Sequence, residues 1–475
     1  MTKKLLFSSA TLALIIFSFV IYYPFTSEAS SINLSTEEKL EQHIENTAKK
    51  LAIPGMTVAI SHNGELIFSK AYGKDVHQDS LFYIGSTSKT FTALAVMQLV
   101  EQGKVDLDTS VSTYLHDFTV SDEITVRHLL HHTSGMTEFE YISSLHDDAL
   151  VSKLIEDMNQ MSLTYEPGEQ FSYFNPNYSL LGAVIENVSG QSYVDYVEDH
   201  IIQPLGLNNT SLIGEVDVAG HLSFFGFSIK RTEPHIEYDL PAGFITSTAE
   251  DVVRFLEAIR MKDPSLGVSP EGIDEMKSSE SFYGMGLMIG EIAGRPAVFH
   301  GGALPGYTSD AVILTEDGYS IAYLINKNHL LNGFIFNPDL TSGIVSILTE
   351  QEPPTRVNYF WVYRLLIVLF AATIIYNMIK IVKMISRPNQ KSLKQRLTAA
   401  IVNLVIPIAI IIVIPILAGV LMQRGMTWEL AFLVMPDMIT WLFIGLAIHI
   451  IQSVIHFVFI FKHYLSLRAN FIKGD

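Results

Sequence analysis

The stretch Leu-Phe-Tyr-Ile-Gly-Ser-Thr-Ser-Lys-Thr-Phe occupies positions 81–91. Within it, Ser86 and Lys89 stand three residues apart at the start of an apolar run. On a helix this spacing places both side chains on one face, one turn apart. An amine held beside a hydroxyl can make a serine nucleophilic without a histidine. Taken alone the pair is weak evidence, because Ser-x-x-Lys is expected by chance about once or twice in a chain of this length. The alternative is a surface serine and a surface lysine on an ordinary helix.

Composition divides the chain into a globular middle and apolar ends. Of its 475 residues 48 % are hydrophobic, and the mean hydropathy is +0.29. Residues 30–352 read as an ordinary globular chain that is long enough to bury a core. The net charge of −18 argues against a nucleic-acid partner, because binding phosphates needs clustered cations. The chain has no cysteine, which excludes disulfides and thiolate metal sites.

Apolar segments at both ends predict export and membrane anchoring. Residues 1–29 combine two early lysines, an apolar run and the small-x-small triplet Ser27-Glu28-Ala29. This order is typical of a signal peptide, and an uncleaved N-terminal anchor is the alternative. Residues 353–475 form a membrane domain in which three apolar runs are each long enough to cross a bilayer as a helix, at about 359–380, 399–422 and 436–461.

The distribution of cations predicts how these spans are oriented. The loop after the first run and the C-terminal tail are rich in cations: Lys380, Lys383, Arg387, Lys391, Lys394, Arg396, Lys462, Arg468 and Lys473. The turn between the second and third runs holds only Arg424. By the positive-inside rule, the loop and tail are cytoplasmic. We therefore expect a multi-pass protein of the cell membrane whose globular domain is extracellular or periplasmic.

The third apolar run carries His449, Gln452 and His456 at helical spacing on one face. Polar side chains inside a bilayer are costly and often functional. The favoured interpretation is a hydrogen-bonded seam between the three helices. The alternative is a path for a substrate.

Within residues 30–352 the patterns predict an α+β domain. Ser35-Thr36-Glu37-Glu38 is a capping box that opens a helix to about Leu51, and Asn63-Gly64 joins two β-rich runs into a hairpin over residues 55–73. The helix that follows Ser86 has one apolar face, formed by Phe91, Leu94, Ala95 and Leu99. After a helical middle at 105–215, strand patterns return at 286–289, 297–299, 311–314 and 320–324, and residues 340–350 form a closing helix. This order predicts an antiparallel sheet that is completed by both ends of the domain, flanked by helices and interrupted by a helical subdomain.

Two further motifs stand downstream of Ser86-x-x-Lys89: Tyr173-Phe174-Asn175 and His300-Gly301-Gly302-Ala303. With them, the chain resembles the serine β-lactamase and penicillin-binding-protein-like hydrolases, in the class C, D-aminopeptidase and esterase branch. The resemblance covers about residues 35–350. It is supported by the stretches at 124–135, 204–207, 241–243 and 247–251.

The resemblance implies a serine acyl-enzyme with Ser86, Lys89 and Tyr173 as catalytic residues. Ser86 would attack a carbonyl, Lys89 would accept its proton with a pKa lowered by apolar neighbours, and Tyr173 would relay a proton to the leaving group. The backbone N–H groups of Ser86 and Ala303 would form an oxyanion hole.

The same resemblance assigns substrate-binding roles to the remaining motif residues. Asn175 would orient a substrate amide, and Gly302 would let a substrate backbone approach the strand that carries His300. His300 and Gly301 stand where β-lactam-destroying members have a lysine and a hydroxyl residue, which disfavours β-lactamase and carboxypeptidase activity.

These observations predict a membrane-anchored extracytoplasmic serine hydrolase acting on a small-molecule or peptide substrate with an amide or ester bond, with D-residue specificity as one form. One alternative is a D-asparaginyl peptidase that activates an exported natural product. An alternative of another class is a penicillin-binding sensor or cell-wall interaction protein without turnover. We expect no cofactor and no metal, because His128, His131 and His132 have no carboxylate at the spacing of a zinc protease. A hydrogen-bonding role is favoured for His132.

Overall fold

The computed structural model describes residues 34–137, 151–233, 235–279, 281–329, 337–353, 359–387, 391–422 and 428–473. The chain forms two compact units, one up to Phe360 and one from Trp361 onward. The signal peptide or anchor expected at residues 1–29 lies outside the described residues.

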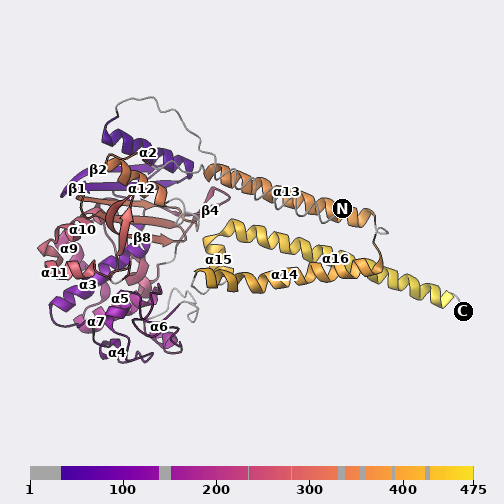
Figure 1. The fold of residues 1–475 in the computed structure, drawn as a ribbon, viewed down its shortest axis with the longest axis horizontal. Helices are drawn as coiled ribbons and strands as arrows, with labels where there is room; N and C mark the ends of the chain where they lie inside the picture. The colour runs from indigo at the N-terminus through magenta and orange to yellow at the C-terminus, as the bar shows by residue number, and fades with distance from the viewer. Residues whose placement is uncertain are drawn as a thin grey trace. The chain divides into compact units, whose positions relative to one another are not determined.

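A six-stranded antiparallel sheet forms the centre of the first unit (Figure 1). Its order is β2-β1-β10-β9-β8-β7, so the N-terminal hairpin pairs directly with the C-terminal strands. The strands are β1 (Gly55–His62), β2 (Glu65–Gly73), β7 (Met288–Ile292), β8 (Arg295–Leu304), β9 (Tyr307–Leu314) and β10 (Tyr319–Ile325). The predicted antiparallel sheet with flanking helices is confirmed.

Local turn chemistry sets up the first hairpin. Asn63 and Gly64 both have positive φ, at 51° and 91°, as a type I′ turn requires. Strand β1 is buried on both of its faces: Val58 and Ile60 belong to one hydrophobic cluster and Ala59 to the other. A strand between two helical layers therefore reads as a nearly continuous apolar run.

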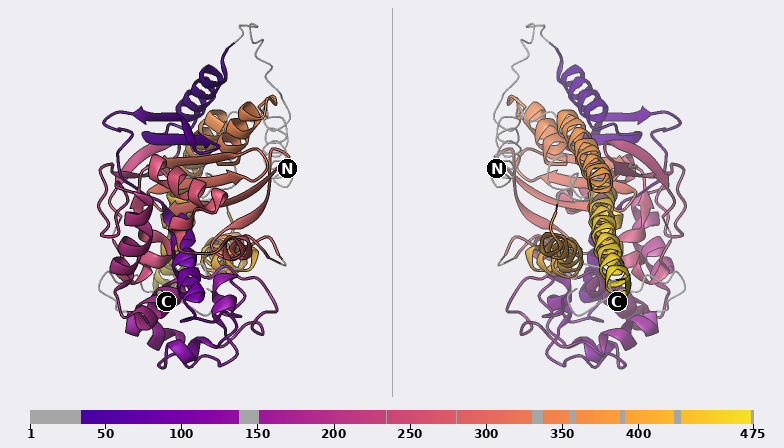
Figure 2. Two further views of the ribbon diagram at one scale, coloured as in Figure 1. Left: turned by 90° about the vertical axis from the view of Figure 1, so that its left-hand side faces the viewer. Right: turned by 90° about the vertical axis from the view of Figure 1, so that its right-hand side faces the viewer.

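Helices cover both faces of the sheet, as Figure 2 shows. On one side lie α2 (Thr36–Lys50) and α12 (Asn337–Leu348), which share a cluster with the sheet. The predicted capping box is present, because Ser35 Oγ accepts from the Glu38 N–H and the Glu38 carboxylate accepts from the Ser35 N–H. On the other side lies α10 (Ala249–Met261), whose Phe255 stacks on Phe91.

Helix α3 (Ser88–Glu101) runs through the middle of the unit. One apolar face was predicted for it, but every residue from Ser88 to Leu99 is buried. The difference arises because the sheet side and the helical subdomain both pack against α3. The other helices of the unit are α4 (Val111–Tyr114), α5 (Val126–Leu130), α6 (Val151–Met158), α7 (Pro176–Ser189), α8 (Tyr193–Val197), α9 (Gln203–Leu205) and α11 (Pro270–Met276).

Short elements complete the first unit. Strands β3 (Phe82–Tyr83) and β6 (Thr246–Ser247) pair beside the sheet. The single turns are η1 (Gly85–Thr87), η2 (Glu198–Ile202), η3 (Glu237–Asp239), η4 (Leu240–Phe244) and η5 (Pro264–Leu266). A separate hairpin of β4 (Gly220–Phe224) and β5 (Phe227–Arg231) had not been predicted.

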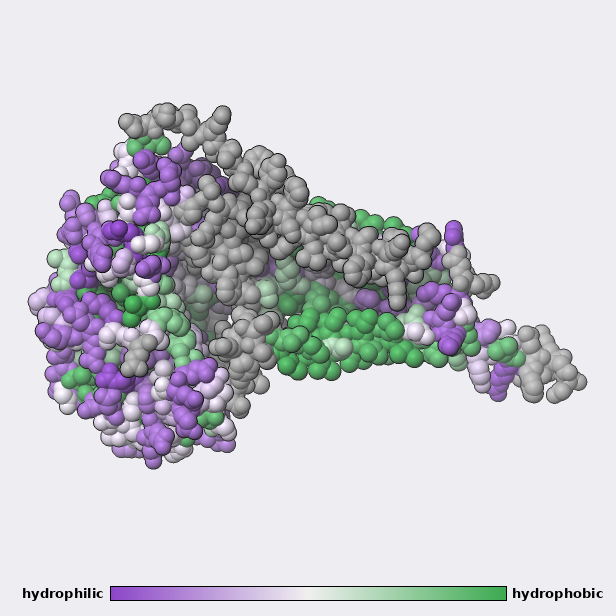
Figure 3. Space-filling view, in the orientation of Figure 1, coloured by the Kyte–Doolittle hydropathy of each residue, from purple (hydrophilic) through white to green (hydrophobic). Residues whose placement is uncertain are grey.

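The second unit contains three helices that are long and apolar enough to cross a membrane, at Leu365–Ser386, Leu393–Leu417 and Pro436–Ala469. Its elements are α13 (Tyr359–Ser386), α14 (Leu393–Met422), α15 (Trp428–Val434) and α16 (Pro436–Lys473). Figure 3 shows the apolar surface of these helices. Apolar helices are thus present at the three predicted spans, although α14 begins earlier and α16 ends later than expected.

Polar side chains connect the three long helices. His449 Nδ1 lies 2.9 Å from Asn403 Oδ1, which links α16 to α14. Gln452 Nε2 donates to Asn377 Oδ1 at 3.0 Å, which links α16 to α13. His456 on the same face is only 1 % exposed. The predicted hydrogen-bonded seam is confirmed for His449 and Gln452.

Candidate active site

Ser86 and Lys89 lie at the junction of η1 and α3, as their spacing predicted. Ser86 is partly exposed, whereas its immediate neighbours on both sides are buried. Gly85 has a φ of 53°, a conformation that glycine adopts readily. The turn therefore presents the Ser86 hydroxyl toward solvent while the rest of the segment packs into the core.

Lys89 is fully buried and holds the site together. Its Nζ atom lies 3.2 Å from Ser86 Oγ, donates to Asn175 Oδ1 at 2.7 Å and donates to the Ala242 carbonyl at 2.5 Å. These partners come from η1, from the residue that precedes α7 and from η4. Three segments that are distant in sequence therefore converge on one amine.

Tyr173 joins this cluster from the segment before α7. Lys89 Nζ lies 5.0 Å from the centroid of the Tyr173 ring and 5.6 Å from that of Tyr178. Tyr173 is partly buried. The structure thus brings together all three residues that were predicted to be catalytic.

The start of η1 is clamped against strands β8 and β9. Ser309 Oγ donates to the Ile84 carbonyl at 2.6 Å, and Thr87 Oγ1 donates to the His300 carbonyl at 3.2 Å. Contact between the backbones is so close that a Cβ on Gly302 would lie 1.9 Å from the Ile84 carbonyl oxygen. A Cβ on Gly85 would lie 2.5 Å from the Ala303 nitrogen. Gly302 and Ala303 therefore lie directly beside the turn that carries Ser86.

Strand β8 has an unpaired edge at this point. Its residues 295–299 pair with β7, whereas residues 300–304 pair, among the described strands, with β9 alone. Ala303 is exposed on this stretch. An extended substrate could add to such an edge through its backbone.

His300 lies beneath the site with its ring facing the protein interior. It is 1 % exposed, its Nδ1 lies 2.8 Å from the Gly301 carbonyl and its Nε2 lies 3.0 Å from the Tyr283 hydroxyl. Because a carbonyl only accepts, Nδ1 carries the hydrogen and Nε2 accepts from Tyr283. Burial, reinforced by the charge of Lys89, lowers the pKa of His300 to about 3. A neutral ring with both nitrogens engaged supports β8 and supplies no positive charge to a substrate.

His132 is a second buried histidine at the site. It is 0 % exposed, and its Nδ1 accepts from the Phe174 N–H at 3.2 Å, consistent with the hydrogen-bonding role favoured for it. Its ring centroid lies 4.4 Å from that of Tyr173 and 5.0 Å from that of Tyr283. Burial, and after it the charge of Lys89, keeps the pKa of His132 well below its usual value. His132 therefore acts as neutral packing for the tyrosine that faces Lys89.

Sequence reasoning missed two groups that complete this site. The Ala242 carbonyl accepts from Lys89, and its only signal was the Pro241-Ala242-Gly243 stretch. The Tyr283 hydroxyl hydrogen-bonds His300 Nε2. A single tyrosine outside any motif carries no sequence signal of such a role. By contrast, His128 and His131 bond elsewhere: His128 Nδ1 accepts from the Thr125 N–H, and His131 Nδ1 lies 3.1 Å from the Tyr283 carbonyl.

The site agrees with a family comparison. Residues 40–341 match the family model described as Beta-lactamase. The chain belongs to the beta-lactamase family. Members of the beta-lactamase family include serine hydrolases and noncatalytic proteins.

Curated proteins similar to this chain include a penicillin-binding protein. Protein flp from Staphylococcus aureus (strain MW2) is 27 % identical over 363 residues, which cover 67 % of this chain and 70 % of that protein. Penicillin-binding protein 4 from Amycolatopsis lactamdurans is 29 % identical over 313 residues, which cover 58 % of this chain and 81 % of that protein.

Two solved structures have a similar fold. The octameric penicillin-binding protein homologue from Pyrococcus abyssi has a TM-score of 0.58 and 27 % identity, covering 69 % of this chain and 80 % of that one. A D-stereospecific amidohydrolase from Streptomyces sp. has a TM-score of 0.54 and 25 % identity, covering 61 % of this chain and 94 % of that one.

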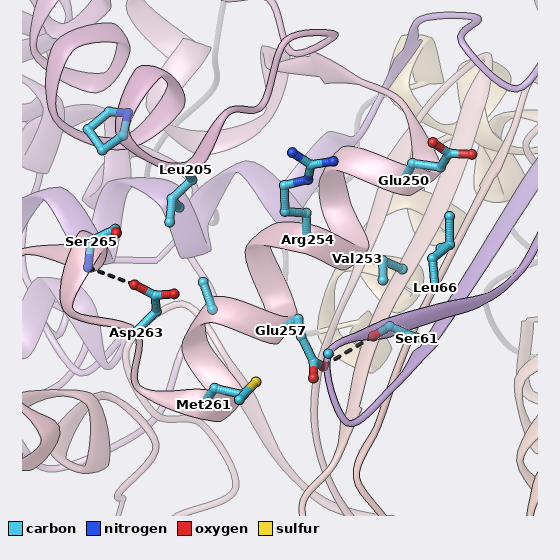
Figure 4. Close-up of a pocket in the computed structure, with 13 residues that line it drawn as sticks. Ser61, Leu66, Leu205, Glu250, Val253, Arg254, Glu257, Met261, Asp263 and Ser265 are labelled. Carbon is cyan, nitrogen blue, oxygen red and sulfur yellow. Dashed lines mark hydrogen bonds between the residues drawn. The ribbon is translucent and has the colours of Figure 1, made fainter.

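A pocket of about 360 Å³ lies apart from these residues, between the β1–β2 hairpin and α10 (Figure 4). Its most buried acid, Glu257, accepts from Ser61 Oγ and Ser320 Oγ and pairs with Arg260. The carboxylate is therefore committed to structural contacts.

Proposed function

We propose that this chain is a membrane-anchored serine hydrolase that works outside the cytoplasmic membrane through an acyl-enzyme on Ser86. The observation that carries the proposal is the contact of 3.2 Å between the buried Lys89 Nζ and Ser86 Oγ. The beta-lactamase family match and the three candidate membrane helices support it.

The neighbours of Lys89 suit a base. A neutral amine has two N–H bonds and one lone pair. The Asn175 Oδ1 and Ala242 carbonyl oxygens are pure acceptors, so they can take the two N–H bonds. The lone pair then faces the Ser86 hydroxyl. Burial also disfavours the charged ammonium form.

The reaction follows from this arrangement. Ser86 Oγ attacks the substrate carbonyl carbon while its proton passes to Lys89 Nζ. Tyr173, beside Lys89, relays this proton: it gives its hydroxyl proton to the leaving amine or alcohol as the carbonyl–leaving-group bond breaks and takes up the proton held by Lys89. The N–H groups of Ser86 and Ala303 hold the negative oxygen. Water then attacks the Ser86 ester and releases the acid.

The substrate is a peptide, amide or ester, and we favour one with a D-residue. The likeness to a D-stereospecific amidohydrolase supports this choice. Because His300 is buried and neutral, the β8 corner offers no histidine cation to a free carboxylate. This supports a blocked substrate rather than one with a free carboxyl terminus. The Asn175 Oδ1 atom accepts from Lys89, so Asn175 would orient the substrate through its side-chain NH2 group.

Covalent labelling of the full-length chain tests the proposal. The chain and its Ser86→Ala variant are incubated in bilayer nanodiscs with a fluorophosphonate and with a fluorescent penicillin, and intact mass is measured. We expect an adduct on the unsubstituted chain that is absent from Ser86→Ala, followed by turnover of D-amino-acid amides or esters. Absence of an adduct on the unsubstituted chain would overturn the proposal that it is a serine hydrolase. A stable adduct without turnover of any substrate would favour the penicillin-binding sensor.

A further inference from the structure

The β4–β5 hairpin has a reversed polarity pattern. Paired residues in an antiparallel ladder share a face, and the pairs are Leu222 with Ile229 and Phe224 with Phe227. All four apolar side chains therefore lie on one face, and His221, Ser223, Ser228 and Lys230 lie on the other. In a hairpin that packs on a core, the apolar face is the one expected to be buried.

Here the polar face is the one turned toward the domain. His221 and Ser223 are 8 % and 1 % exposed, and Ser228 Oγ donates to the Ala52 carbonyl. Phe227 and Ile229, by contrast, are 69 % and 49 % exposed. Leu222 and Phe224 beside them are partly exposed, so the hairpin presents a contiguous, partly exposed apolar face, which marks an interaction surface.

The root of the hairpin is firmly attached near the open edge of β8. The His221 N–H donates to the Gly306 carbonyl and the Ser223 N–H donates to the Asn328 carbonyl. Gly306 lies in the turn that joins β8 to β9, just beyond Ala303. In Figure 1, β4 lies at the margin of the unit, outside the six-stranded sheet.

The hairpin carries two cations. Lys230 is exposed at the border of the apolar face, on the polar side of the ladder, and Arg231 pairs with Glu233 at 2.7 Å. Exposed aromatic and aliphatic side chains next to a lysine are typical of surfaces that insert at the headgroup level of a bilayer.

The chain that follows the domain allows such a contact. Thr349 and Gln351 are hydrogen-bonded back to α12, so about seven residues, 352–358, separate the domain from Tyr359, and they can reach about 25 Å. Leu348 lies near Tyr319, at the end of the sheet away from the hairpin. Since β10 has 7 residues and is therefore about 23 Å long, the linker is long enough to return along the sheet.

We propose that the apolar face of the β4–β5 hairpin, formed by Leu222, Phe224, Phe227 and Ile229, inserts into the interface of the bilayer that holds the C-terminal helices. The contact holds the β8 edge beside Ser86 close to the membrane surface. The inference rests on the candidate spans and on the membrane anchoring in the proposed function, and it is independent of the acyl-enzyme chemistry.

Single-cysteine labelling tests the contact, because the chain contains no cysteine of its own. Phe227→Cys and Ile229→Cys are spin-labelled in the full-length chain, reconstituted in vesicles of phosphatidylethanolamine and phosphatidylglycerol. Collisions with oxygen, which concentrates in lipid, are compared with collisions with a water-soluble nickel complex. We expect the oxygen-to-nickel ratio at both positions to exceed severalfold the ratio at two control positions.

The controls separate insertion from mere exposure. Lys230→Cys lies on the same strand but on the polar face, and Met261→Cys is an exposed apolar position, 58 % exposed, next to the β1–β2 turn at the other end of the sheet. Equal ratios at Phe227→Cys and Met261→Cys overturn the proposal. Protection from both reagents, or dipolar broadening between labels, also overturns it, because the face is then covered by protein. Thermal unfolding of each variant verifies that the fold is intact. The spin-label result does not depend on acylation of Ser86, so a failure of this proposal can be distinguished from a failure of the proposed enzymatic function.

Discussion

Lys89 Nζ and Asn175 Oδ1 lie 2.7 Å apart, although 86 positions separate the two residues in sequence. The contact connects the helix behind the nucleophile to the segment that carries Tyr173. Asn175 Oδ1 accepts one N–H of the Lys89 amine. This hydrogen bond fixes the directions of the other N–H bonds and of the lone pair on Nζ. The site therefore depends on an amide, not only on the serine and lysine.

Replacing Lys89 with methionine should remove the base while filling most of the same space. We expect acylation of Ser86 by an activated ester to slow by about 10²–10⁴-fold. The measurement is the rate of fluorophosphonate labelling together with ester hydrolysis, with circular dichroism as the folding control. An unchanged rate in a folded variant would show that another group takes the proton.

Asn175→Asp should move the pH profile. A carboxylate in place of Oδ1, 2.7 Å from Nζ, favours the ammonium form and so raises the pKa of Lys89. The base form then needs a higher pH, so the acidic limb of the rate profile should shift upward. Asn187→Asp, on the exposed side of the same helix α7, is the matched control and should leave the profile in place. If the pH profile of Asn175→Asp does not shift, the Asn175 side chain does not influence the group that accepts the Ser86 proton.

Two neighbouring glycines should respond differently to alanine. A Cβ at Gly302 would meet the Ile84 carbonyl oxygen at 1.9 Å, whereas at Gly301 the nearest atom would be 3.7 Å away. Gly302→Ala should destabilise the fold by about 1–3 kcal/mol or more, since backbone must move, and should also abolish acylation. Gly301→Ala should change stability by less than about 1 kcal/mol. Chemical denaturation of both variants checks this, and equal effects would contradict the close approach of η1 to β8.

Lys327 should make stability depend on alkaline pH. Its Nζ donates to the Leu51 and Ala52 carbonyls, it is 3 % exposed, and burial lowers its pKa to about 8 from the usual 10.5. Between these values the unfolded chain holds a proton that the folded chain has released, so stability rises with pH there, by at most about 3 kcal/mol. Lys327→Met should lose this rise.

Denaturation of both chains from about pH 7.5 to about pH 9.5 covers most of the window that can be reached before tyrosines ionise. The informative quantity is the difference in slope between the two chains, because other groups titrate equally in both. Parallel curves would mean that Lys327 keeps an ordinary pKa.

The polar seam of the second unit should serve assembly. Replacing His449, Gln452 and His456 together with leucine should lower the thermal stability of the helical unit, because bonds such as Gln452 to Asn377 contribute about 0.6 kcal/mol each on average. Turnover of a water-soluble substrate should stay the same. If turnover of a membrane-delivered substrate falls while assembly is intact, the seam lines a substrate path instead.

The elements predicted well are those with strong local signals. The capping box at Ser35, the Asn63-Gly64 turn and the long apolar runs each depend on residues close together in sequence, and the structure contains all of them. The β4–β5 hairpin was missed because its strands are only five residues long and its Phe225-Gly226 turn lacks the strong Asn-Gly or Asp-Gly signal.

By itself, the sequence determined the order of motifs, the antiparallel sheet and the apolar helices, because these follow from side-chain type and short-range spacing. Only the tertiary structure decided that Asn175 and the Ala242 carbonyl meet Lys89, and that His300 points inward to Tyr283. Such contacts depend on how segments far apart in the chain pack together. A backbone carbonyl also has no side-chain identity to read, and an alternating pattern such as that of the β4–β5 hairpin does not say which of its faces will be buried.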